Sequence, residues 1–223
     1  MTAVPALRVV PEVAAPDLEA ATVAARAFLQ ALGLPLDGAG MAASPRRMAA
    51  AWSEMLSPQP FDLTTFPNDG GYREVVVARD LPLHSICEHH LLPFTGVAHV
   101  AYAPGERILG LSKMARLVEM FARRPQVQER LTQQVADWLD ENLGARGVGV
   151  VVEAHHQCMS LRGVRTPAAT TVTAAFHGSL REPAARAELL ALVRASPDGV
   201  APSPSDDVAA SSPDGVAPAG VAP

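Results

Sequence analysis

Two short clusters combine cysteine with histidine, and together they hold every cysteine of the chain. Cys87-Glu88-His89-His90 places a thiol and an imidazole three residues apart, and His155-His156-Gln157-Cys158 supplies the second thiol. Thiolates and imidazole nitrogens are ligands that zinc prefers, and three of them leave a fourth tetrahedral position open for water. Zinc lowers the pKa of such a water toward neutrality, which makes it a nucleophile. The clusters therefore predict a catalytic zinc centre.

The residue pattern leaves other readings of these clusters open. A closed structural site would use His89 or His156 as a fourth ligand, and spacing alone does not say which histidine binds. The two cysteines could also form a disulfide, although metal binding is the more common reason for such a pair in a reducing cytoplasm. The first ten residues do not resemble a secretory signal, and no apolar run could span a bilayer. We therefore expect a cytoplasmic protein without a membrane partner.

Cationic and polar side chains form further candidate groups. Ser112, Lys113 and Arg116 lie at a predicted helix start, where amides, a hydroxyl and positive charges could hold phosphates. The segment 162–165 adds two arginines shortly after Cys158. On spacing alone, a capped helix start is favoured for the first group and a loop with solvated charges for the second. The histidines outside the two clusters are best read as ordinary surface or core residues, and they are His84, His99 and His177.

Composition limits the partners and the number of domains. The chain has 223 residues, of which 48% are hydrophobic, enough for one domain with a sizeable core. Its net charge of −5 gives no general attraction to nucleic acid or anionic membranes. We expect a flexible arm over 1–15, a catalytic domain over 16–194 and a disordered tail over 195–223. The tail is rich in Ser, Pro, Ala and Gly and repeats the heptapeptide SPDGVAP.

The elements that must position these clusters follow from hydrophobic periodicity. Helical spacing predicts helices over 18–32, 44–55, 112–123, 125–143 and 184–193, with Ser44 and Ser112 as N-caps. Strand patterns cover 74–78, 96–102, 148–154 and 170–176. The first cluster then lies at a strand end or between strands, and the second ends another strand. This order predicts an α+β domain with a mostly antiparallel sheet backed by helices.

Taken together, the motifs resemble those of GTP cyclohydrolase I. The resemblance rests on segments that occur in order within about 16–194, and these are 85–90, 110–113, 124–130 and 153–158 with Arg162-Gly163. The family implies the tunnelling fold (T-fold), with an antiparallel sheet, a helix pair and additional N-terminal helices. It also implies that the sheets of several subunits join into a barrel. The homo-oligomer is usually a decamer of two pentameric rings, with sites between subunits.

The resemblance also implies a role for each candidate residue. Cys87, His90 and Cys158 would bind zinc, and His89 and His156 would transfer protons. Ser112, counted among the catalytic residues, would face the ribose and triphosphate of the substrate GTP. The remaining substrate contacts would be Glu88 near the metal, Gln128 and Glu129 at the guanine, and Arg47, Lys113, Arg116 and Arg162 at the phosphates. From the residue types alone, Glu129 could accept two N–H groups, although a carboxylate is also normal in a helix first turn.

The implied reaction is the hydrolysis of GTP to 7,8-dihydroneopterin triphosphate and formate, the first step of pterin and tetrahydrofolate biosynthesis. Water adds at C8, the imidazole ring opens and formate leaves. One departure concerns the start of the second helix. Many relatives have a Lys or Arg where this chain has Ala50, a change that lowers triphosphate affinity unless Arg46 compensates.

Two other functions remain as alternatives. A zinc nucleoside deaminase also attacks a base with activated water, but its P-C-x-x-C signature is missing. A non-catalytic paralogue that binds GTP or a pterin would explain Ala50.

Overall fold

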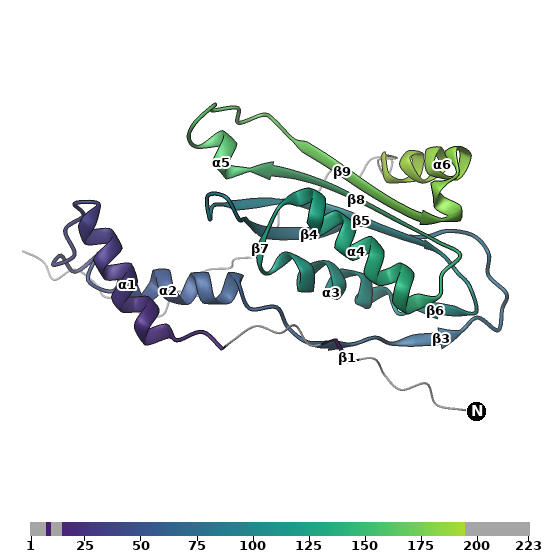
Figure 1. The fold of residues 1–223 in the computed structure, drawn as a ribbon, viewed down its shortest axis with the longest axis horizontal. Helices are drawn as coiled ribbons and strands as arrows, with labels where there is room; N and C mark the ends of the chain where they lie inside the picture. The colour runs from purple at the N-terminus through teal and green to yellow at the C-terminus, as the bar shows by residue number, and fades with distance from the viewer. Residues whose placement is uncertain (1–7, 10–14, 195–223) are drawn as a thin grey trace, which may run out of the picture. The chain divides into compact units, whose positions relative to one another are not determined.

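A five-stranded sheet organises the part of the chain that the computed structural model describes, residues 8–9 and 15–194 (Figure 1). The strand order is β7-β4-β5-β8-β9. Neighbouring strands are antiparallel except for the short β7, which runs parallel to the end of β4. The bounds are β4 (Val76–Cys87), β5 (Pro93–Ala103), β7 (Pro125–Gln126), β8 (Gly147–His156) and β9 (Thr171–Gly178). The predicted α+β class and the mostly antiparallel sheet are confirmed.

Two helices, α3 (Leu111–Ala122) and α4 (Gln128–Leu143), cover one face of this sheet (Figure 1). Their apolar stripes meet the sheet in the main core, where Met114, Leu117, Leu131 and Leu139 are almost completely buried. Burying a side chain of this size stabilises the fold by about 1.5–3 kcal/mol. A helix pair between two strand pairs is the subunit arrangement of the T-fold. The barrel that would join several subunits stays a prediction.

The opposite face of the sheet is covered at one end by helix α6 (Pro183–Arg194). Ala101 packs there with Leu180 and Leu189, whereas its strand neighbours Val100 and Tyr102 belong to the main core. Alternate residues of a strand point to opposite faces, so this end of the sheet is buried on both sides. The predicted helix over 184–193 is confirmed.

The structure corrects both predicted serine caps. Ser44 is the first residue of α2 (Ser44–Met55), and Ala43 occupies the cap position without a side-chain hydrogen bond. Ser112 is the second residue of α3, because Gly110 occupies the cap position and donates its N–H to Thr64 O at 3.0 Å. Pairing of β3 (Thr65–Pro67) with β6 (Arg107–Leu109) fixes the chain just before α3. That pairing determines where the helix begins.

Two further boundaries differ from the prediction. Pro125 does not start a helix: it pairs with β4 as part of β7, and α4 begins at Gln128 after the extended Val127. Strand β4 is longer than predicted because the pairing continues past an irregularity between Ala78 and Leu81. At that bulge Asp80 has φ +56° and donates its N–H to His99 Nδ1 at 3.2 Å. The strand thereby delivers Cys87 at its end.

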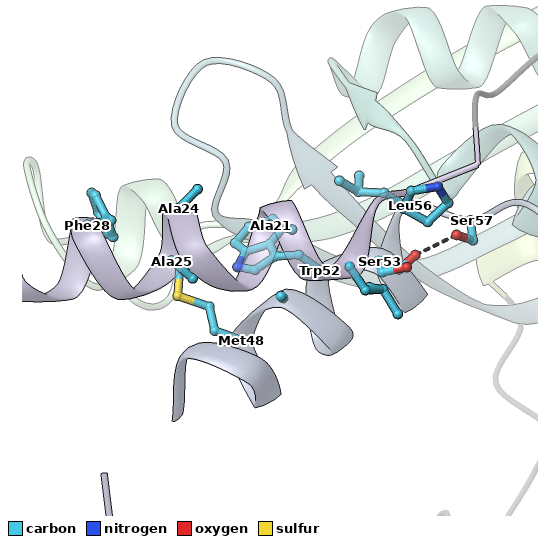
Figure 2. Close-up of a pocket in the computed structure, with 12 residues that line it drawn as sticks. Ala21, Ala24, Ala25, Phe28, Met48, Trp52, Ser53, Leu56 and Ser57 are labelled. Carbon is cyan, nitrogen blue, oxygen red and sulfur yellow. Dashed lines mark hydrogen bonds between the residues drawn. The ribbon is translucent and has the colours of Figure 1, made fainter. Parts of the chain in front are cut away.

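The N-terminal helices α1 (Leu18–Ala31) and α2 pack against each other. Asp17 caps α1 by accepting the Ala20 N–H at 2.9 Å, and Gly33 adopts the predicted left-handed conformation after it. An apolar pocket of about 540 Å³ lies beside this pair. Figure 2 shows Phe28 and Trp52 among the residues that line it. None of the residues lining it is titratable, so the pocket offers no acid–base or metal chemistry.

Three short elements complete the described chain. Strand β1 (Arg8–Val9) pairs with β2 (Phe61–Asp62), helix α5 (Gln157–Ser160) follows β8, and a 3₁₀ turn covers Ser179–Arg181. Apart from 8–9 and Ala15, the predicted arm over 1–15 lies outside the described residues, as does the predicted tail over 195–223. The domain boundaries therefore stay a prediction. No helix among the described residues has the length and apolar character needed to cross a membrane.

Candidate metal centre

Three predicted ligands meet where strand β4 ends and helix α5 begins. Cys87 closes a tight turn in which its N–H donates to Leu92 O at 2.9 Å and its carbonyl accepts the Leu91 N–H at 2.8 Å. The turn brings His90 back, so that its Nδ1 lies 3.8 Å from Cys87 Sγ. Cys158, in α5, places its Sγ 3.9 Å from that of Cys87. The ligand atoms of all three side chains lie within 4.8 Å of one another.

The distances of 3.8 Å and 3.9 Å from Cys87 Sγ to its two neighbours are close to those around a tetrahedral metal ion. Bonds of about 2.3 Å to sulfur and 2.0–2.1 Å to nitrogen place neighbouring ligand atoms roughly 3.5–3.8 Å apart. A disulfide would require the sulfurs to approach to about 2.05 Å, so the two buried cysteines are free thiols. Burial, and the nearby Cys87, raise the pKa of the Cys158 thiol. A bound cation reverses that preference because it stabilises the thiolate. The donor set therefore fits zinc.

Neither alternative fourth ligand belongs to this group. Within the described part of the chain, Cys87, His90 and Cys158 form the only group of three potential ligands close enough to share an ion. His89 Nδ1 lies 3.9 Å from Cys87 Sγ but stands outside the group. His156 turns its Nε2 to Gln128 Oε1 at 2.9 Å. The arrangement therefore offers three ligands from the described residues.

The imidazole of His156 lies at the end of β8, two residues before Cys158. It stacks on the Phe94 ring with centroids 4.6 Å apart and planes inclined by 8°. Burial lowers the pKa of His156, and the negative charge of Glu129 partly opposes this effect. A lowered pKa favours the neutral ring at physiological pH, and a neutral ring can accept a proton.

The side chain of Gln128 does not face an open site. It is 1% exposed, and its amide nitrogen lies within hydrogen-bond distance of Val152 O, Thr171 O and Thr173 Oγ1. The structure thus gives the Gln128 amide protein partners on two strands, in addition to His156. Glu129, by contrast, is exposed in the first turn of α4.

A polar network that the sequence did not reveal holds the turn between Cys87 and His90. The Glu88 carboxylate pairs with the Arg130 guanidinium of α4, and this hydrogen bond lowers the pKa of Glu88. Arg130 also donates from Nε to Gln126 Oε1 at 2.8 Å, and Gln126 donates to Phe121 O at 2.9 Å. In addition, the Glu88 N–H donates to Gln126 O at 3.0 Å. The ligand turn is therefore tied to α4 and to the end of α3.

This network predicts that Arg130→Met weakens zinc binding. Partners that orient metal ligands typically contribute 10–100-fold to metal affinity, so we expect a loss of roughly tenfold. The measurement is zinc retention against a competing chelator. Arg123→Met is the matched control because Arg123, directly after α3, forms a similar ion pair with Glu119 of that helix. Equal zinc retention in both variants would show that the Arg130 pair does not support the turn.

The predicted phosphate-binding residues of α3 do not join the metal group within one chain. Ser112 and Lys113 lie in the first turn of α3, and Arg116 in the second, whereas Ala122 at the other end accepts the Ser85 hydroxyl at 2.7 Å. Ala122 is nine positions after Lys113 in the helix, a rise of about 14 Å at 1.5 Å per residue. These side chains therefore project from the end of α3 that lies away from the metal turn.

The other predicted substrate contacts and histidines are spread over the chain. Arg162 is exposed after α5, and its charge is close enough to oppose the raised pKa of Cys158. Arg47 lies in α2 and donates to Gly40 O at 2.9 Å, and Arg46 and Ala50 are exposed on the same helix. The three histidines set aside earlier lie outside the metal group. His84 is exposed, His99 supports the bulge of β4, and His177 lies 2.8 Å from Asp137.

Comparison with known proteins agrees with this picture. The family model described as GTP cyclohydrolase I matches residues 21–194. GTP cyclohydrolase 1 of Aquifex aeolicus is 48% identical over 179 residues, which cover 80% of this chain and 97% of that protein. The enzymes of that name from Bifidobacterium longum and Streptomyces griseus are each 50% identical, over 79% and 80% of this chain and 91% and 92% of their own lengths.

A solved structure of the apo archaeosine synthase QueF-Like matches 47% of this chain and 94% of its own, with a TM-score of 0.38 and 16% identity. That likeness is too weak to bear on the fold. The match to the family model and the identity to three full-length relatives are decisive on their own. The chain belongs to the GTP cyclohydrolase I family.

Proposed function

We propose that this protein hydrolyses GTP to formate and 7,8-dihydroneopterin triphosphate, the first step of pterin and tetrahydrofolate biosynthesis. The observation that carries the proposal is the three-ligand group of Cys87, His90 and Cys158, with His156 two residues before Cys158 and held by Gln128. Membership of the GTP cyclohydrolase I family supports the same reaction. The deaminase alternative receives no comparable support.

The side chains around the centre have separate tasks in this proposal. A zinc ion, when bound by Cys87, His90 and Cys158, supplies the Lewis acidity that activates water at neutral pH. The His156 imidazole would accept a proton from the attacking water and would return it to a purine nitrogen as the imidazole ring of the substrate opens. His89, next to the ligand His90, is a second proton carrier. General acid–base catalysis of this kind typically accelerates a reaction by about 10²–10⁴-fold.

Recognition of the substrate needs groups at both ends of GTP. The exposed carboxylate of Glu129 can accept two N–H groups from the guanine edge, and it lies in the same first turn of α4 as Gln128. Arg162 follows α5 and can bind phosphate near the metal. Because the chain carries a net charge of −5, the triphosphate requires local cations such as these.

In this proposal, the α3 cations that bind phosphate at one metal centre belong to a second subunit. Ser112 and Lys113 lie at the end of α3 remote from their own metal turn, and Arg116 lies in the next turn, so a second subunit must bring an equivalent set to it. We propose a homo-oligomer, a decamer of two pentameric rings by family resemblance, in which sheets join into a barrel. Arg47 of α2 is a further candidate phosphate contact.

The direct test is formate release from GTP. Zinc-loaded protein should yield one formate per GTP consumed and a product that oxidises to a fluorescent pterin, and chelation of the metal should stop both. Ammonia without formate would identify a deaminase. Binding of GTP with neither product would identify a non-catalytic module.

The cellular setting is proposed on narrower grounds. The two cysteines are free and buried, with their sulfurs 3.9 Å apart, which suits a reducing compartment such as the cytoplasm. The substrate GTP is the only small-molecule partner we propose, with no nucleic acid or membrane partner.

A further inference from the structure

The amide group of Gln128 sits in a buried polar network whose hydrogen-bond directions can be followed. Thr132 donates its hydroxyl proton to Gln128 O at 2.8 Å. The Thr132 and Thr173 hydroxyl oxygens are 2.6 Å apart, so Thr173 must be the donor between them. The Thr173 oxygen is then free to accept from Gln128 Nε2 at 3.2 Å.

Two backbone carbonyls independently require the Gln128 amide to point its Nε2 toward them. Val152 O and Thr171 O lie 3.1 Å and 2.9 Å from Gln128 Nε2. Rotating the amide by half a turn would place Oε1 against both carbonyls, and acceptors facing each other in a buried site are costly. Gln128 Oε1 must therefore be the atom that faces His156 Nε2 at 2.9 Å.

An acceptor at this position requires a proton on His156 Nε2. In a neutral imidazole one nitrogen carries the proton and the other carries the lone pair, so the lone pair lies on Nδ1. Stacking on Phe94 holds the plane of the ring. The atom of His156 that is available to accept a proton is then Nδ1.

We propose that Gln128 is a positioning residue that fixes both the tautomer and the orientation of His156, in place of the guanine contact expected for its side chain. Gln128 Nε2 has three acceptors within the protein for its two hydrogens, and the side chain is 1% exposed, so it has no donor left for a ligand. This inference rests on the proposed function in that His156 transfers the proton. Guanine recognition then falls to Glu129.

The tautomer can be read without any enzyme assay. The probe is solid-state ¹⁵N NMR of the sedimented, histidine-labelled wild-type protein at a pH where the ring is neutral, with the His156 signals assigned by their loss in His156→Gln. We expect a protonated Nε2 and an unprotonated Nδ1. A protonated Nδ1 would overturn the proposal. Because this experiment needs no turnover, it stands even if the protein releases no formate.

The kinetics of the Gln128→Met variant are a second test of this proposal. Methionine keeps the length of the side chain but removes the acceptor, so His156 loses its orientation and kcat should fall by about tenfold or more, with little change in KM for GTP. The matched control is Gln133→Met, on the next turn of α4, where the side chain bonds to Asp137 and should leave both constants unchanged. A raised KM with unchanged kcat would show that the Gln128 side chain binds guanine, and it would contradict the inference. Should Gln128→Met not fold, the wild-type spectrum decides alone.

Discussion

Replacing Cys158 by serine should abolish zinc retention, and formate release with it. Cys158 is one of three ligands, and its Sγ lies 3.9 Å from that of Cys87. Serine is a poor zinc ligand because its hydroxyl stays protonated at neutral pH, whereas a zinc-bound thiol is deprotonated. We expect metal analysis after gel filtration to find about one zinc per wild-type chain and none in Cys158→Ser, as a three-ligand site implies.

The informative control for this result is His156→Ala. Its imidazole contacts Gln128 and Phe94 and is not one of the three ligands, so this variant should keep its zinc. Turnover should nevertheless fall by about 10²–10⁴-fold, the usual contribution of a general acid–base group. Loss of zinc from His156→Ala would show that His156 is a ligand and that the open coordination position is assigned wrongly.

The main elements of the fold could be predicted because their signals are local. Apolar residues at helical spacing mark α1, α3 and α4, and β-branched runs mark the centres of β5 and β8. The full length of β4 could not be predicted in this way. Asp80 and Pro82 interrupt its pattern, and the strand continues only because pairing with β5 resumes at Leu81 after the bulge. The helix starts at Leu111 and Gln128 depend in the same way on strand pairing with distant segments.

In the candidate site, too, only the features with local sequence signals could be predicted. The metal ligands could be found from sequence because each cluster is contiguous and its chemistry is recognisable. The groups that hold them could not, since Arg130 meets Glu88 across 42 positions and Gln128 meets His156 across 28. Neither Arg130 nor Gln126 shows any sign of this network in the sequence. Family resemblance placed Gln128 at the guanine. A resemblance between sequences does not show toward which partners the Nε2 and Oε1 atoms of a buried glutamine point.

Mixing two inactive variants should restore formate release if the site lies between subunits. Cys158→Ser retains the cations of α3 but lacks the metal half of the site. The double variant Lys113→Ala/Arg116→Ala retains the metal half but lacks those cations, which lie about 14 Å and about 9 Å along α3 from the end nearest its own metal turn. In assemblies of equal composition, about a quarter of the sites should combine two intact halves at a heterologous interface.

The measurement uses two chains carrying different tags, co-expressed and purified through both tags, so that only mixed assemblies are assayed. The matched control pairs Cys158→Ser with His90→Ala. Both of these variants lack the metal half, so their mixed assemblies contain no intact site and should stay inactive. Recovery in the first mixture alone would show that one chain supplies the zinc ligands while another supplies the phosphate contacts. The first mixture could also stay inactive although the chains had assembled. The cations of α3 would then have to serve the metal centre of their own chain, and the proposal that two subunits form the GTP site would be wrong.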